Sequence, residues 1–218
     1  MLRGFRVITL PPDPSLGEAV STHPDTLLFY HNKRIITTAE YCDEAAYIFS
    51  DVREMCPDVK ISFTSDVRGK KYPEDCSMNC LVISDKIFCN TEYVSDAIKD
   101  YAKGTGLKMV HTNQGYAACT VLAFGNKAIT ADRGMAKILE ENGTKVLLIS
   151  PGHIALPPYE YGFIGGASLV YNNIVCFFGD LSCHPDGKRI YDFITTSGYK
   201  VACLSAHGLI DLGGGVLL

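Results

Sequence analysis

The sequence predicts an α/β fold in which one strand–strand–helix–strand unit is repeated around a ring. Two observations lead to this prediction. Four segments share an apolar run, a short polar turn and a second apolar run, and their turns recur every ~40–55 residues, the spacing of a repeated supersecondary unit. A stretch with helical apolar spacing and then another apolar run follow each segment.

Each unit begins with a predicted hairpin of two strands. The turns contain residues that tolerate a positive φ, as tight hairpins require: His31-Asn32, Ser84-Asp85, Gly125-Asn126 and Asn172-Asn173. The hairpins are therefore expected over Thr26–Thr37, Cys80–Asn90, Thr120–Thr130 and Ser168–Gly179.

A helix and a third strand complete each unit. Polar and acidic residues predict helix starts at Thr38, Thr91, Thr130 and His184. Three of the helices are expected to end at glycines, namely Gly106, Gly143 and Gly198. The third strands are predicted at Val59–Phe63, Leu107–His111, Lys145–Ile149 and Tyr199–Leu204.

The two ends of the chain are predicted to share a fifth unit. This unit begins at His207 and is cut short by the end of the sequence at Leu218. An unpaired apolar run, Phe5–Leu10, resembles the third strand of a unit and is expected to complete it. Ring closure removes exposed sheet edges, so we expect one closed domain over residues 1–218. The alternative, an open doubly wound sheet, leaves the hairpins and the N-terminal run unexplained.

The composition is that of a folded protein with a sizeable core. The chain has 218 residues, of which 47% are hydrophobic and 20% charged, and a net charge of -4. These values exclude a disordered chain, and the mild acidity argues against broad binding to nucleic acid or to an anionic membrane. Short apolar runs and the absence of a signal-like N-terminal stretch predict a cytoplasmic location.

The nine cysteines favour buried free thiols over a disulfide framework. Their number is odd, and the closest pair with few intervening residues, Cys76 and Cys80, lacks the spacing of a zinc site. Most are flanked by apolar residues, as buried thiols in a reducing compartment are. We therefore expect no cofactor and no bound metal.

Five strings of residues resemble those of a known superfamily. Together they span much of the chain: Tyr72–Cys80, Asn113–Cys119, Ile129–Gly134, Gly152–Pro157 and Tyr159–Ser168. From about residue 22 to its end, the sequence resembles the guanidine-modifying enzymes, or penteins, and within them an uncharacterised branch. The resemblance implies a five-unit β/α-propeller with pseudo-fivefold symmetry, closed here by the N-terminal strand.

The resemblance also implies a chemistry that can be checked position by position. Enzymes of the superfamily bind a guanidinium group with carboxylates, use a histidine as general acid and base, and attack with a cysteine near the C-terminus. The positions that match are Gly213–Gly215 for the cysteine, Phe163–Gly166 for the histidine and Cys119 for one carboxylate. Hydrolysis by the familiar mechanism is therefore not expected.

Residues just before the first strand of each unit are expected to face the axis of the ring. The predicted ligand-binding residues are Asp25, Glu74, Asp75, Asn79, Asn113, Gln114, Tyr116, Glu160 and Asp211, with Tyr161 as a further stacking ring. Carboxylates suit a cationic group, amides orient a polar ligand, and aromatic rings stack on a planar or cationic group. Cys119 and His207 are the weak catalytic candidates. A metal site of His23, His207 and Asp211 is a less favoured alternative.

Each candidate also has a structural interpretation. Glu74-Asp75 suits a solvated turn, Asn113–Gly115 suits a turn closed by side-chain amides, and Cys119 suits a small buried position. Gly165-Gly166 and Gly213–Gly215 suit close backbone packing rather than phosphate binding.

Two functions remain open from the sequence. The first is an axial site for a small polar ligand, guanidino or amino-acid-like, without the usual amidinohydrolase mechanism. The second is a non-enzymatic scaffold or protein-interaction module on the same fold. Convergence of the polar residues on a pocket favours the first, and an axis plugged by Met78, Tyr116 and Phe163 favours the second.

Overall fold

The protein is a mixed α/β structure with several small sheets. The computed structural model describes residues 5–66 and 68–218. Four of the sheets share one topology, in which the first two strands are antiparallel and the second and third are parallel. Their strands are β1 (Leu28–His31), β2 (Arg34–Thr38), β3 (Lys60–Thr64); β4 (Leu81–Ile83), β5 (Lys86–Cys89), β6 (Lys108–His111); β7 (Val121–Phe124), β8 (Lys127–Thr130), β9 (Lys145–Leu148); and β11 (Ser168–Tyr171), β12 (Ile174–Phe177), β13 (Lys200–Cys203).

The four predicted hairpins are confirmed, and their turns use the expected backbone. Ser84, Gly125 and Asn172 have φ of 55°, 55° and 52°. In the first hairpin the positive φ values fall on Asn32 and Lys33, at 47° and 58°, one residue later than expected. Such values match the right-handed twist of the strands that each turn joins.

Helices connect the second and third strands, as predicted. The helices are η1 (Glu18–Val20), α1 (Pro24–Leu27), α2 (Ala39–Glu44), α3 (Ala46–Met55), η2 (Glu74–Cys76), α4 (Asp96–Thr105), α5 (Ala117–Thr120), α6 (Arg133–Glu141), η3 (Leu181–Cys183) and α7 (Gly187–Thr195). Thr38 caps α2 by accepting a hydrogen bond from the Tyr41 amide, and Gly106 ends α4 with a φ of 75°.

The predicted start of α4 at Thr91 is wrong. Asn90 instead organises a turn, because its carbonyl accepts from the amides of Tyr93 and Val94 and its side chain accepts from Glu92. The helix begins at Asp96, where the Ser95 hydroxyl accepts from the Ala97 amide at 3.2 Å.

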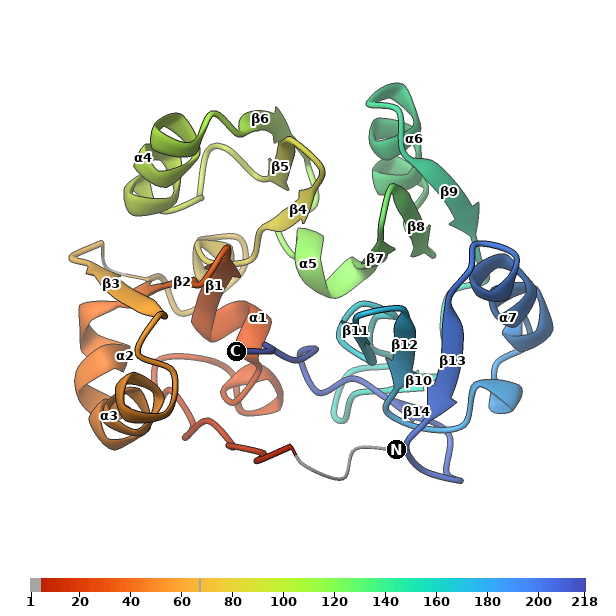
Figure 1. Ribbon diagram of the computed structural model, residues 1–218, viewed down its shortest axis with the longest axis horizontal. Coiled ribbons are helices and arrows are strands. Elements are labelled where there is room, and N and C mark those ends of the chain that lie inside the picture. Colours follow the sequence, from red (N-terminus) through yellow and green to blue (C-terminus); the bar gives the residue numbers. More distant parts are fainter. Residues whose placement is uncertain (1–4, 67) are drawn as a thin grey trace.

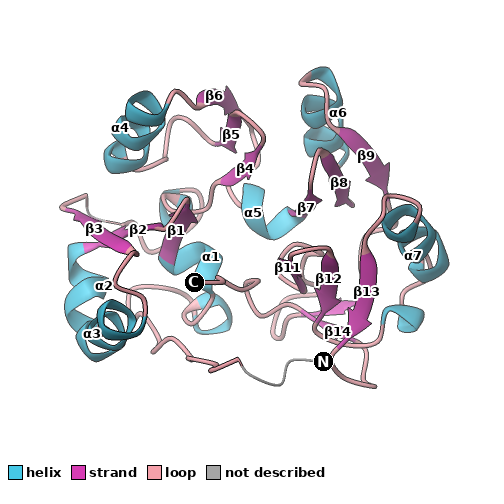
Figure 2. Cartoon of the chain, in the orientation of Figure 1, coloured by secondary structure: helices cyan, strands magenta, loops and turns pink. Residues whose placement is uncertain are grey.

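The first strands of the four sheets lie toward the middle of the molecule. Figures 1 and 2 show β1, β4, β7 and β11 around the centre, with the third strands and helices α2, α3, α4, α6 and α7 outside them. Buried apolar side chains fill the space around each sheet, for example Ile98 and Ala102 of α4 with Ile87 of β5. Loops before the first strands are thereby brought close to the centre.

The predicted strand at Phe5–Leu10 is wrong, and it does not close a fifth unit. This segment forms no strand; Val7 is 81% exposed, and the following Pro11 and Pro12 have no amide to donate. The fifth sheet instead pairs β10 (Ile154–Ala155) in parallel with β14 (Leu209–Ile210). Hydrogen bonds from the amides of Leu212 and Gly214 to the Gly166 carbonyl then hold the end of the chain.

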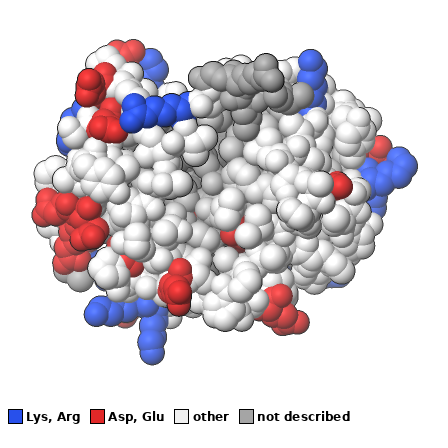
Figure 3. Space-filling view, turned by 90° about the horizontal axis from the view of Figure 1, so that it is seen from below, with Lys and Arg blue, Asp and Glu red and all other residues white. Residues whose placement is uncertain are grey.

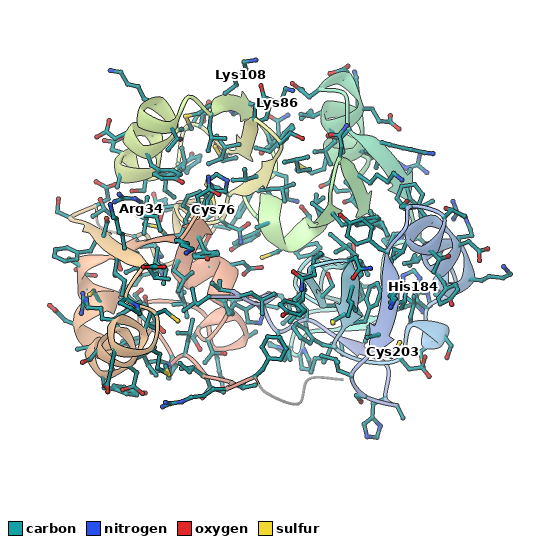
Figure 4. All side chains as sticks on the ribbon, viewed as in Figure 1. Arg34, Cys76, Lys86, Lys108, His184 and Cys203 are labelled. Carbon is teal, nitrogen blue, oxygen red and sulfur yellow. The ribbon has the colours of Figure 1, made fainter. Side chains whose placement is uncertain are left out.

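Charged side chains lie mainly at the margins of the molecule. On the face shown in Figure 3, lysine and arginine side chains gather at the edges and the middle is largely uncharged. Figure 4 shows Lys86 and Lys108 at the outer side of their sheet, where both pair with Asp85. Across residues 5–66 and 68–218, no helix combines the length and the apolar character that a membrane span needs.

Candidate functional site

The first strands of the four sheets enclose a central cavity of about 360 Å³, which we call the axial cavity. Its walls come from β1, β4, β7 and β11 together with the C-terminal segment Gly213–Val216. Most of the lining side chains are apolar, and Asp25 is the only charged one among the described residues. A cavity of this size and composition is typical of a small-molecule site.

Asp25 is held at this cavity by the start of α1. Pro24 occupies the first turn, where its missing amide costs nothing, and the Asp25 amide donates to the Gly213 carbonyl at 3.2 Å. Burial, and then the nearby Asp211 carboxylate, raise the pKa of Asp25 to about 8. Hydrogen bonds from Cys119 and Thr26 oppose this rise, and no lysine or arginine is among the groups that shift it.

Asp211 lies behind Asp25 and has a structural role. It is 2% exposed and accepts hydrogen bonds from the amides of Phe163 and Gly213 at 2.8 and 2.9 Å. The His23 Nδ1 atom lies 3.8 Å from its carboxylate. Burial raises the pKa of Asp211, and these neighbours partly offset the rise. For His23, burial has the opposite effect on the pKa and lowers it, because burial favours the neutral form of each group. The neutral imidazole is therefore favoured.

Cys119 and Asn79 complete the cluster. Asn79 is fully buried, and its side chain accepts from the Ala118 amide at 2.7 Å and donates to the Cys119 sulfur at 2.9 Å. Burial, followed by the charges of Asp25 and Asp211, raises the pKa of the Cys119 thiol well above its ordinary value. This thiol is therefore protonated at neutral pH, which does not suit a nucleophile.

Glycines allow the backbone to pack against this cluster. A Cβ atom at Gly162 or Gly166 would collide with the Asp211 side chain, and one at Gly165 would collide with the Ala118 and Cys119 carbonyls. Close backbone packing, rather than phosphate binding, therefore explains these glycines.

Replacing Gly213 by alanine is expected to destabilise the protein by more than about 2 kcal/mol. Gly213 has a φ of 74°, and a Cβ atom there would lie 2.6 Å from the Cα atom of His23. Gly143→Ala is the matched control, because Gly143 has a φ of 87° but no atom within 4 Å of the added Cβ. Urea unfolding should show the smaller loss, about 1 kcal/mol, in this control. Equal losses in the two variants would contradict the proposed contact.

Asp75 and Tyr116 belong to a second cluster, which lies outside the axial cavity. The Tyr116 hydroxyl donates to Asp75 Oδ2 at 2.7 Å. Asp75 Oδ1 has no partner among the described atoms. Burial raises the pKa of Asp75, and the nearby Arg68 opposes the rise. Neither Asp75 nor Tyr116 lines the axial cavity.

Gln114 lines a separate cavity of about 310 Å³, together with Tyr161. Its amide nitrogen donates to Asp132 Oδ2 at 3.1 Å, and its oxygen accepts from the Tyr116 amide at 3.0 Å. The predicted convergence of Gln114 with Asp25 is therefore not found.

Four further candidates point away from the axial cavity. Glu74, Asn113, Glu160 and His207 are all exposed. Glu74 and Asp75 lie in one turn of the short helix η2, so that successive side chains leave in different directions. His207 precedes β14 in an exposed loop. In the part of the chain that the structure describes, no three His, Cys, Asp or Glu side chains are grouped to hold a metal ion.

The sequence did not single out two buried groups. The sequence suggests His23 as a residue of a segment facing the axis, as a possible neighbour of Cys119 and as a metal ligand, but not as the partner of Asp211, beside which its ring lies. Arg68 is 5% exposed and pairs with Asp13 at 3.0 Å, across 55 residues of sequence. For His23, the sequence does contain a signal: Pro24 predicts the start of a helix, and His23 and Asp25 lie directly before and after it. No local pattern marks the second.

The chain belongs to a family of unknown function, DUF6873, whose model matches residues 2–216. The search of curated proteins finds no match.

Solved structures show that the fold is that of the pentein guanidine-modifying enzymes. DDAH from Pseudomonas aeruginosa, a mutant complexed with citrulline, is 14% identical with a TM-score of 0.50. A dimethylarginine dimethylaminohydrolase adduct with S-methyl-L-thiocitrulline is 15% identical with a TM-score of 0.52. Both matches cover 84% of this chain and 70% of the other. Agmatine deiminase from C. jejuni is 8% identical with a TM-score of 0.51, and the match covers 79% of this chain but only 62% of that one.

Proposed function

We propose that this protein binds a small cationic ligand, guanidino or amino-acid-like, in the axial cavity, without the usual amidinohydrolase mechanism. Asp25 is the observation that carries the proposal. It is the only charged side chain among the described residues of the cavity wall, and Asp211 lies behind it. A half-buried carboxylate beside a second, buried one is costly to ionise unless a cation or a proton neutralises it.

The similar structures support the guanidino class of ligand. DDAH is complexed with citrulline, dimethylarginine dimethylaminohydrolase forms an adduct with S-methyl-L-thiocitrulline, and agmatine deiminase has its substrate bound. These ligands belong to those proteins, and the low identities support only the fold. The carboxylate at the cavity of this chain is what makes a cationic member of the class suitable here.

We also infer that the five sheets correspond to five units of one β/α-propeller domain. Four sheets have the same topology, and their first strands line one cavity. The two-stranded sheet of β10 and β14 would be a reduced fifth unit. In such a domain the axis of the ring would pass through this cavity, which would place a ligand site at the centre.

A thermal-shift screen of small cations tests the function. Methylguanidine, longer alkylguanidines, arginine and simple amines form the panel, and neutral analogues of the same size form its control. The proposal predicts that at least one cation raises the unfolding temperature and that Asp25→Asn abolishes the shift. Glu160→Gln is the matched control, because Glu160 is exposed and absent from the cavity wall. A panel without any shift would contradict the proposal and favour the non-enzymatic scaffold.

The affinity for a cation is expected to rise with pH until about pH 8. Because the pKa of Asp25 in the empty protein is about 8, a cation that binds below this pH must displace the proton. Linkage then predicts up to ~10-fold weaker binding for each pH unit below 8 and a plateau above it. Calorimetric titrations of a guanidinium that binds, across this range, measure the slope. An affinity independent of pH would mean that Asp25 does not receive the cation.

A further inference from the structure

Two cysteines face each other across the hairpin of β4 and β5. Leu81 pairs with Phe88 in this hairpin, so the same register, continued by one residue, pairs Cys80 with Cys89. Both side chains belong to one buried cluster with Met78 and Ile87, which places them on the same face of the sheet.

The register puts this pair in the position that suits a disulfide. The hairpin turn has two residues, so the flanking pair Ile83–Lys86 is hydrogen-bonded. Hydrogen-bonded and non-hydrogen-bonded pairs alternate along the strands, which makes Cys80–Cys89 non-hydrogen-bonded. The Cα atoms of such pairs are ~4.5 Å apart, within the range that a disulfide spans.

The two thiols also interact in the reduced protein. A hydrogen bond from the Cys80 thiol lowers the pKa of Cys89. Burial, and then the same hydrogen bond, raise the pKa of Cys80. By contrast, Cys176 is equally buried, but only burial shifts its pKa and no other thiol contributes.

The axial cavity gives a small oxidant access to this pair. Cys80 lines the cavity, whereas Cys89 lies behind it and is 1% exposed. An oxidant of the size of a peroxide that enters the cavity therefore reaches the pair from the side of Cys80.

We propose that Cys80 and Cys89 form a reversible disulfide when a peroxide enters the axial cavity. The Cys89 sulfur, which accepts the hydrogen bond of the Cys80 thiol, attacks the peroxide, so that an S–O bond forms, the O–O bond breaks and one water leaves. The Cys80 sulfur then displaces the oxygen, which forms the S–S bond and releases a second water. Two thiols are thus oxidised by two electrons and the peroxide is reduced to two waters. A thiol reductant reverses the bond.

Mass spectrometry of the full chain tests this pairing. Cys183 and Cys203 are exposed and would react first with peroxide or with another molecule, so both are changed to serine in the background used. This protein is treated with hydrogen peroxide, its free thiols are blocked, and linked peptides are mapped. The expected result is loss of two hydrogen atoms in mass, one linked peptide joining Cys80 to Cys89, and full recovery with dithiothreitol.

Single substitutions separate the pair from general oxidation. Cys80→Ala and Cys89→Ala should each abolish the linked peptide, and Cys176→Ala should leave it unchanged. Circular dichroism shows whether each variant is folded, and Cys80→Ser replaces Cys80→Ala if it is not. Seven unmodified thiols in the background protein, or a link from Cys76 to either residue, would overturn the proposal. Cys76 is the relevant competitor, because it is buried near both thiols.

Discussion

The Asp25→Asn protein is expected to be more stable than the unmodified protein at pH 7, by about 4 kcal/mol. Burial and Asp211 raise the pKa of Asp25 from 3.8 to about 8 on folding. Between these two values the folded chain holds a proton that the unfolded chain has released. The stability is therefore fully present below pH 3.8 and is lost as the pH rises, until it levels off above about pH 8. Asparagine is neutral at every pH and escapes this loss.

Urea unfolding of both proteins at several pH values measures the effect. The difference in free energy of unfolding should be small near pH 4 and should grow by about 1.4 kcal/mol for each pH unit up to pH 8. Asp43→Asn is the matched control, because Asp43 is exposed. If the free energy of unfolding changes equally in Asp25→Asn and Asp43→Asn, the pKa of Asp25 is not raised on folding, and this explanation is wrong.

The neighbouring carboxylate is expected to behave in the opposite way. Asp211→Ala should destabilise the protein by about 3 kcal/mol or more, because the amides of Phe163 and Gly213 then become buried donors without acceptors. The His23 ring, whose Nδ1 atom lies 3.8 Å from this carboxylate, also loses that neighbour. Removal of the buried side chain leaves a cavity in addition, which increases the loss.

Two further variants check this explanation of Asp211. Asp211→Asn keeps one acceptor oxygen, so it should lie between the alanine variant and the unmodified protein. Asp180→Ala is the control for a partly exposed acceptor, because Asp180 caps η3 through the Ser182 amide and water can replace it there. A loss at Asp211 no greater than that at Asp180 would show that these hydrogen bonds do not hold the C-terminal segment.

These opposite signs distinguish a structural carboxylate from a functional one. Asp211 accepts hydrogen bonds from two backbone amides, which offset part of the cost of its burial, whereas Asp25 lines the cavity and no lysine or arginine is among the groups that shift its pKa. A residue that lowers the stability of the empty protein is typical of a binding site, since natural sequences rarely retain such groups for the fold alone. The site therefore consists of one half-buried carboxylate, Asp25, held next to the buried Asp211.

The repeated units were predictable because each depends on local patterns. Paired apolar runs, turn residues such as Ser84 and Gly125, and terminal glycines such as Gly106 all act within one unit. The two-stranded sheet was not predictable in this way. Its strand β14 pairs with β10, about 55 residues away in sequence, and an apolar run at Phe5–Leu10 is not by itself evidence of a sheet partner.

The candidate site was predicted only in part, for a geometric reason. Asp25, Asn79, Cys119 and Asp211 converge because each lies at a tightly held start or end of an element near the centre. Glu160 and Asn113 also lie in loops before inner strands, yet both face solvent. Which way a loop side chain points depends on contacts between segments far apart in the sequence, such as that of Gly166 with Asp211, which no local pattern records.

The most direct test is the number of protons that a bound cation releases. Calorimetry of an alkylguanidinium at pH 7, in two buffers with different heats of ionisation, measures this number together with the affinity. The proposed site predicts one bound cation, release approaching one proton for each, and no binding to Asp25→Asn. Binding that is unchanged in Asp25→Asn, or no binding of any alkylguanidinium, would contradict it.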